Sequence, residues 1–114
     1  MFSLFTCGVI PQAALEQVVL EDPQERAVFV ALGTRFWPGG LTLIAPMAAH
    51  LPLCLTAGTG KVGVRVPNHP VALALLRACN VPVAAPSANR FGHVSPTSVS
   101  KIWSLKCTTN EVFF

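Results

Sequence analysis

The hydrophobic positions of this chain fall into alternating short runs and helix-spaced stretches. Strands are predicted at residues 2–10, 41–45, 62–66 and 81–85, where apolar and β-branched residues run together. Helices are predicted at residues 12–20, from 22 to about 35, and at 71–79. The last helix is almost wholly apolar, which predicts burial on most of its sides. This alternation is typical of an α/β domain with a partly parallel sheet.

Polar residues mark where two of these helices begin and where one ends. Asp22 precedes Pro23 and stands three residues before Glu25, so it is expected to cap a helix. Asn68 is expected to cap the next helix, and Asn80 to end that helix in the left-handed conformation. Four apolar residues of the helix after Asp22 are expected to face inward: Ala27, Val28, Ala31 and Leu32.

Composition limits the chain to one domain at most, because it has 114 residues. Hydrophobic residues make up 52% and charged residues 11%, so part of the surface is expected to be covered by another segment or chain. Exposed sheet edges predict a homo-oligomer. No apolar run reaches the roughly 18 residues of a membrane helix, so no membrane is expected among the partners.

The charges are separated along the sequence. The five acids are Glu16, Glu21, Asp22, Glu25 and Glu111, and all eight lysines and arginines lie between Glu25 and Glu111. This one-signed region suits an anionic ligand such as a nucleotide, pyrophosphate or RNA. A solvated basic face on an ordinary domain fits the same pattern.

The cysteines and histidines do not predict a metal site. Metal-ligand spacing is absent from both sets, which are Cys7, Cys54, Cys79, Cys107, His50, His69 and His93. Free buried thiols in a reducing compartment are expected. The first residues lack the basic region of a secretory signal. A cytoplasmic location is therefore expected, with an organelle left open if a targeting segment precedes the chain.

A polar turn after the last strand is the first candidate site. Residues 82–97 read PVAAPSANRFGHVSPT, and Pro86 stops the strand just before Ser87, Asn89 and Arg90. Open α/β sheets bind ligands at such strand ends, and a hydroxyl and an amide can hydrogen-bond phosphate or ribose. A simple turn is the alternative. A serine nucleophile is not predicted, because the Gly-x-Ser-x-Gly elbow and a nearby carboxylate are absent.

Two further strings carry candidate chemistry. In FWPGGLT, residues 36–42, the glycine pair allows close backbone approach and Thr42 offers a hydroxyl, although the aromatic residues also suit a plain core. Arg65 lies in an apolar strand, where it needs a carboxylate, a carbonyl cluster or an anionic ligand. Residues 57–61 (AGTGK) lack the spacing of a phosphate loop.

Three strings together resemble the YrdC-type threonylcarbamoyl-AMP synthases: FWPGGLTLI at 36–44, VGVRVPNHPVALALL at 62–76 and PVAAPSANRFGHVSPT at 82–97. The resemblance implies an α/β fold with a twisted mixed sheet, flanking helices and a basic concave face. It implies a nucleotidyltransferase that joins L-threonine, bicarbonate and ATP to give threonylcarbamoyl-AMP and pyrophosphate for tRNA modification. Mg²⁺ would then be held mostly by phosphates, with no protein-ligated metal.

The resemblance also assigns roles to single residues. Thr42, Ser87, Asn89 and Ser95 match the nucleotide contacts of the family, and Ala85 lies near its threonine pocket. Arg65 matches the strand arginine of the family, and with Arg90 it is a candidate for anion or RNA contact. No catalytic acid or base is predicted, so such a site would act by positioning and charge stabilisation.

The chain departs from the family at three places. The Lys-x-Arg segment of the family has no match here, residues 98–114 do not resemble the Gly-rich strand that follows SPT, and Gly40 replaces the usual proline. An incomplete domain is therefore expected, with residues 1–97 as a partial YrdC-like domain and 98–114 as a divergent tail.

Weak or absent activity is expected of such a chain. The alternative is a non-catalytic module that binds double-stranded RNA through the basic face. A related carbamoyl-transfer enzyme would need acylphosphatase-like and zinc-binding segments, for which 114 residues leave no room.

Overall fold

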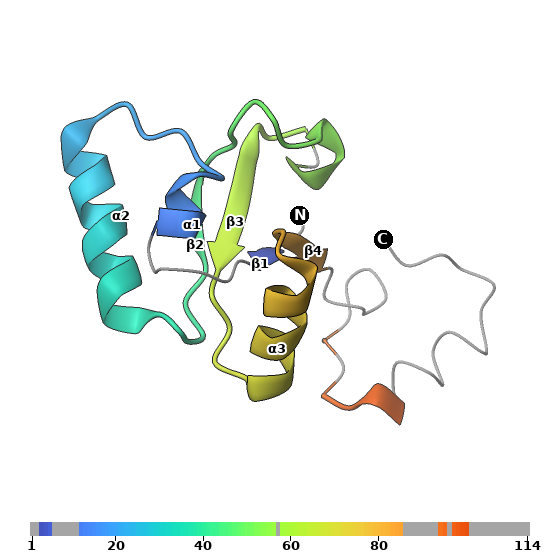
Figure 1. Ribbon diagram of the computed structural model, residues 1–114. Coiled ribbons are helices and arrows are strands. Elements are labelled where there is room, and N and C mark those ends of the chain that lie inside the picture. The colour runs from blue at the N-terminus through green and yellow to red at the C-terminus, as the bar shows by residue number, and fades with distance from the viewer. Residues whose placement is uncertain (1–2, 6–11, 57, 86–93, 96, 101–114) are drawn as a thin grey trace.

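A computed structural model describes residues 3–5, 12–56, 58–85, 94–95 and 97–100 of the chain (Figure 1). Its strands are β1 (Ser3–Phe5), β2 (Leu43–Pro46), β3 (Lys61–Arg65) and β4 (Val83–Ala85). They form one sheet in the order β2-β3-β1-β4. β1 runs parallel to β3, whereas the β1–β4 and β2–β3 pairs are antiparallel. The mixed sheet that the sequence predicted is confirmed.

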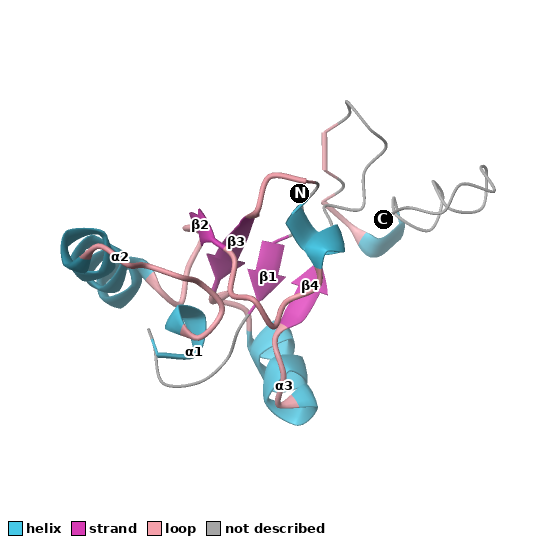
Figure 2. Ribbon diagram, turned by 90° about the horizontal axis from the view of Figure 1, so that it is seen from above, coloured by secondary structure: helices cyan, strands magenta, loops and turns pink. Residues whose placement is uncertain are grey.

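Of the described α-helices, two lie on one side of this sheet and one lies beyond an edge. They are α1 (Gln12–Leu15), α2 (Pro23–Phe36) and α3 (Pro70–Cys79), with a short 3₁₀ helix at Leu53–Thr56. Seen from above, α1 and α3 lie on the same side of the sheet, and α2 lies outward of β2 (Figure 2). Within the described part of the chain, no helix is long and apolar enough to cross a membrane.

α2 begins where the sequence predicted, but it buries a different face. The Asp22 side chain accepts a hydrogen bond from the Gln24 amide at 2.8 Å, and Pro23 occupies the first turn. Phe29 and Gly33 are the buried residues of α2, because Phe29 packs edge-on against Trp37 with ring centroids 5.8 Å apart. The predicted inward set is wrong: Leu32 is half-buried, and Ala27, Val28 and Ala31 are exposed.

The helix predicted over residues 12–20 is wrong beyond Leu15. Val18 forms an antiparallel bridge with Met47. The Val19 amide donates to the Pro46 carbonyl at 2.9 Å, and the Gln17 carbonyl accepts from the Ala48 amide at 3.1 Å. Pairing beside β2 therefore overrides the helical spacing of this segment.

α3 has the predicted length but not the predicted cap or burial. Its N-cap is His69 rather than Asn68, and His69 makes no side-chain cap bond. Asn80 ends the helix with φ of 51°, as predicted. Only Leu76 is buried among the α3 residues. Leu73 is half-buried against the core, whereas Val71 and Leu75 are exposed.

The core is centred on β3. Val62 and Val64 are fully buried there, and Trp37, Ala14 and Ala45 pack in the same cluster. The loop predicted over 46–60 is largely confirmed, and Gly58 and Gly60 adopt positive φ at its tip.

The predicted burial of the thiols is wrong at two positions. Cys54 and Cys79 are free but exposed, because one lies on the 3₁₀ helix and the other in the last turn of α3. Cys7 and Cys107 lie outside the described residues.

Candidate functional site

Two of the predicted site residues lie at the same end of the sheet. Leu43 of β2 pairs with Val64 of β3 in antiparallel register. Continuing this register by one residue places Thr42 opposite Arg65. Both residues are half-buried. A hydroxyl and a guanidinium, from segments about 20 residues apart in sequence, therefore meet at one edge of the core.

The turn before Thr42 is tightly anchored. Trp37 is 6% exposed, and its indole N–H donates to the Leu41 carbonyl at 2.7 Å. The Trp37 amide donates to the carbonyl of Gly33, in α2, at 3.0 Å. The Gly39 amide donates to the carbonyl of Val66, just beyond β3, at 2.8 Å. These bonds fix the turn at residues 37–40 to both α2 and β3, and so fix the start of β2.

Arg65 contributes to the same anchoring. Its Nε–H donates to the Gly39 carbonyl at 2.8 Å, so Gly39 is bonded to the end of β3 through both of its backbone groups. The sequence predicted a carboxylate, a carbonyl cluster or an anionic ligand beside Arg65, and the Gly39 carbonyl is one such acceptor. A guanidinium carries five N–H donors in a planar fork, so this bond orients the group as well as satisfying one donor.

Ala85 lies farther along the sheet. It pairs with Ser3, which in turn pairs with Gly63, so Ala85 is two strands and two residues away from Arg65. With ordinary strand spacing this separation is about 12 Å between Cα atoms. β4 runs antiparallel to β1, so its end points away from Thr42 and Arg65. Of the predicted residues on the sheet, Ala85 thus lies apart from the pair Thr42 and Arg65.

The structure gives little information on the other predicted site residues. Ser95 is exposed. Ser87, Asn89 and Arg90 lie outside the described residues, so their roles stay predictions. Among the described residues, no group of three His, Cys, Asp or Glu side chains is placed to hold a metal ion.

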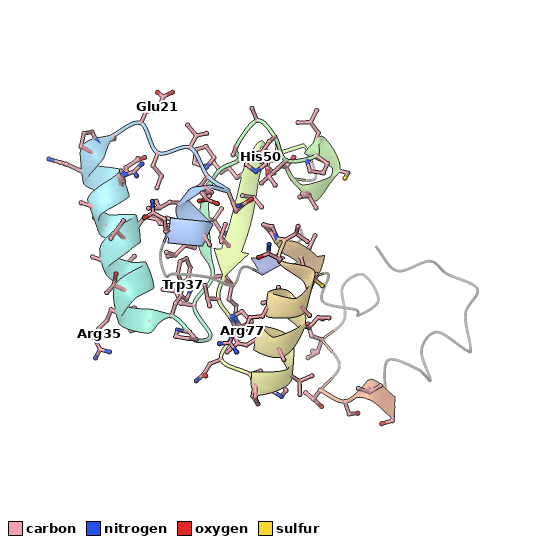
Figure 3. The ribbon with its side chains drawn as sticks, in the orientation of Figure 1. Glu21, Arg35, Trp37, His50 and Arg77 are labelled. Carbon is pink, nitrogen blue, oxygen red and sulfur yellow. The ribbon has the colours of Figure 1, made fainter. Side chains whose placement is uncertain are left out.

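Trp37 and Gly39 are the residues that sequence reasoning undervalued. Trp37 lies between the end of α2 and the sheet (Figure 3), where it fills the core and also bonds the turn. A Cβ on Gly39 would clash with the Phe36 carbonyl oxygen, whereas one on Gly40 would meet nothing. The glycine pair itself was the available signal, but the sequence does not say which glycine is constrained.

Known proteins are similar to this chain in both sequence and fold. Residues 10–106 match the model of the Sua5–YciO–YrdC family, which is described as "Telomere recombination". The chain is 43% identical over 88 residues to the threonylcarbamoyl-AMP synthase of Pyrococcus abyssi, covering 77% of this chain and 25% of that protein. It is 51% identical over 69 residues to the synthase of the same name from Bacillus subtilis, covering 60% of this chain and 20% of that protein.

A solved structure agrees with these matches. The crystal structure of P. abyssi Sua5 complexed with L-threonine aligns with a TM-score of 0.74 and 37% sequence identity. The alignment covers 90% of this chain and 28% of that chain. The present chain therefore spans about a quarter of the length of the relatives that it matches.

Proposed function

Because this chain belongs to the Sua5–YciO–YrdC family, we propose that it supplies part of the ATP- and threonine-binding site of a threonylcarbamoyl-AMP synthase acting in tRNA modification. The family match confirms the resemblance found in the sequence and the incomplete α/β fold expected from it. Relatives from bacteria, an archaeon and a yeast carry the synthase name, and the P. abyssi structure holds L-threonine.

One observation carries the proposal. In this chain, Thr42 lies opposite Arg65, and the turn just before Thr42 is held by hydrogen bonds to α2 and to the end of β3. A hydroxyl and a guanidinium are suitable partners for phosphate or carboxylate oxygens. Thr42 would contact the nucleotide together with Ser87, Asn89 and Ser95. Ala85 would lie on the threonine side, with Arg65 and Arg90 providing positive charge.

The reaction needs positioning more than acid–base chemistry. The threonine amine and bicarbonate give a carbamate and water, one carbamate oxygen attacks the α-phosphorus of ATP, and pyrophosphate leaves. Donors held in place beforehand stabilise the charge on the phosphates and orient the reacting groups. Mg²⁺ would be bound mainly through the phosphates of ATP. The described residues of this chain would bind and orient the substrates.

The test is calorimetric titration of Mg²⁺–ATP into the 114-residue chain, with and without L-threonine. Replacing Thr42 by valine keeps the shape of the side chain but removes the hydroxyl. Loss of one hydrogen bond worth about 1 kcal/mol weakens the affinity for ATP about five-fold. Thr34→Val is the matched control, because Thr34 is exposed on α2 and lies outside the proposed site.

Ser87→Ala examines the segment after β4 in the same way, and it is expected to weaken ATP binding to a similar extent. If Mg²⁺–ATP binds a folded chain and all three variants bind equally well, the nucleotide site lies elsewhere. If a folded chain binds neither ATP nor L-threonine, the proposal is wrong for this chain. Binding of double-stranded RNA, the alternative from the sequence, gains no support from the relatives and is not proposed.

A further inference from the structure

A groove lies between α2 and the edge of the sheet. β2 is the outermost strand on that side, and α2 lies farther out than β2 (Figure 2). This groove of about 740 Å³ separates the two elements. Its apolar lining comes from Val28, Phe29 and Leu32 of α2 and from Leu43 and Ile44 of β2. Among the described residues, Thr42, Arg65, Ala85 and Ser95 do not line this groove.

The backbone of β2 presents one open position toward this groove. Met47 donates to Gly60 on the β3 side, so alternate residues Ala45 and Leu43 also direct their backbone groups toward β3. Ile44 and Pro46 direct theirs outward. The Pro46 carbonyl is already bonded to the Val19 amide, and proline has no N–H. The outward groups of Ile44 are therefore where an added strand would pair.

The side chains beside this position are apolar and accessible. Val28 of α2 is 58% exposed and Ile44 of β2 is 57% exposed, and both line the groove. Contiguous exposed apolar residues beside an open strand edge are typical of binding surfaces. Strand addition uses both features, because main-chain bonds give affinity and alternate side chains enter the groove.

The charged residues of the groove indicate the charge that a bound peptide segment should carry. Asp22 and Glu25 line the groove where α2 begins, and Lys61 is the only cation among the described residues that line it. Two carboxylates against one ammonium leave this end net negative. A segment with a lysine or arginine there would complement it. β2 itself reads Leu-Ile-Ala-Pro and has no cation, so pairing with the β2 edge of a second copy would not supply one.

We propose that the outer edge of β2 binds an extended segment of another polypeptide chain, as an added strand over the groove. The segment is apolar at alternate positions and carries a basic residue that reaches Asp22 and Glu25. Its backbone pairs with Ile44, and its apolar side chains pack against Val28 and Leu32. Thr42 and Arg65 of the proposed synthase site do not line this surface.

The probe is a short capped peptide in which valine alternates with threonine, with lysine at both ends so that either strand direction places a cation at the acidic end. Two control peptides separate the contributions. One carries glutamate in place of lysine, and the other has N-methylated backbone amides that cannot donate. Fluorescence anisotropy gives the affinity, and hydrogen exchange followed by NMR gives the protection of the Ile44 amide.

The expected result is binding of the lysine peptide with slower exchange at Ile44, and at least ten-fold weaker binding of the N-methylated peptide. Val28→Lys weakens binding of the lysine peptide by about ten-fold, equivalent to 1.4 kcal/mol. The matched control is Val71→Lys, because Val71 is 69% exposed on α3, away from the groove. Glu25→Gln weakens binding about two-fold at low salt, as for a rim charge, whereas Glu16→Gln has no effect.

Three outcomes would overturn the proposal. The folded chain does not bind the lysine peptide, or it binds with equal affinity in the Val28→Lys and Val71→Lys variants, which places binding elsewhere. In the third outcome, the Ile44 amide is protected without peptide and light scattering shows a dimer that Val28→Lys dissociates. The occupant would then be a second copy of the chain.

Discussion

Gly39 is the residue on which the turn between α2 and β2 depends. Its amide bonds to Val66 and its carbonyl accepts from Arg65, so both backbone groups connect the turn to the end of β3. The absence of a side chain is required there, because a Cβ would clash with the Phe36 carbonyl oxygen. Gly40 meets no such limit. Neighbouring glycines thus have opposite tolerance for a methyl group.

Alanine substitutions distinguish the two glycines. Gly39→Ala is expected to lower the free energy of unfolding by about 1–3 kcal/mol, because the methyl group displaces the turn. Gly40→Ala is expected to be neutral or to raise it by up to about 1 kcal/mol, because it restricts the unfolded chain. Urea unfolding followed by circular dichroism measures both. Equal destabilisation by the two variants would mean that the turn does not constrain Gly39.

Single residues were predictable from sequence only where their chemistry is local. The position of Arg65 in an apolar strand showed that it needed an acceptor, but its partner Gly39 lies 26 residues earlier in the chain. The approach of Thr42 to Arg65 likewise depends on strand register, which no single residue encodes. The role of Trp37 was ambiguous because an indole that fills a core and one that anchors a turn look alike in sequence.

At the scale of elements, α2 shows how strongly a local signal can fix a helix start. Asp22 has extended backbone angles and accepts a hydrogen bond from the Gln24 amide, while Pro23 needs no partner for an amide. The helix then continues for 14 residues to Phe36. Its ordered start also holds Asp22 and Glu25 at the end of the groove beside β2.

Removing the cap tests this assignment. Asp22→Ala is expected to lower the free energy of unfolding by about 1 kcal/mol, because an amide in the first turn loses its acceptor. Asp22→Asn retains the acceptor and should keep most of the stability. Glu21→Ala is the control, because Glu21 is exposed and precedes the cap. The assignment fails if denaturant unfolding finds Asp22→Ala and Glu21→Ala equally stable.

The ends and faces of elements were less predictable than their existence. Residues 16–20 have helical spacing, yet Val18 pairs with Met47 because the edge of β2 offers backbone partners. The inward face of α2 is set by the packing of Phe29 on Trp37, a contact that forms only after the chain turns back. Local caps at Asp22 and Asn80 were correct because both depend on backbone groups within the same helix.

At the scale of the whole molecule, apolar surface remains exposed on α3. Val71 is 69% exposed and Leu75 is 57% exposed, one turn apart on the same helix. Leu76, the next residue, is 4% exposed and packs inward. The low charge of the sequence predicted such a surface, and the structure locates part of it.

Lysine substitutions separate surface from core on this helix. The pair Val71→Lys and Leu75→Lys is expected to raise solubility and to change the free energy of unfolding by less than about 0.5 kcal/mol per site. Leu76→Lys is expected to cost about 3 kcal/mol or more, because it buries an unpaired charge. Thermal unfolding and the saturation concentration in buffer measure the two effects. A large stability loss in the double variant would show that these side chains pack inward.

The strand order has a consequence for how the chain reaches this structure. β1 lies between β3 and β4, and Ser3 pairs with both Gly63 and Ala85, so its partners follow it by at least 60 residues. β2 and β3 are close in sequence and can form a hairpin early, but β1 has no strand to pair with until β3 is made. Such distant contacts slow folding. During synthesis, β1 would remain unpaired until β3 has left the ribosome, and its second edge would stay open until β4 follows.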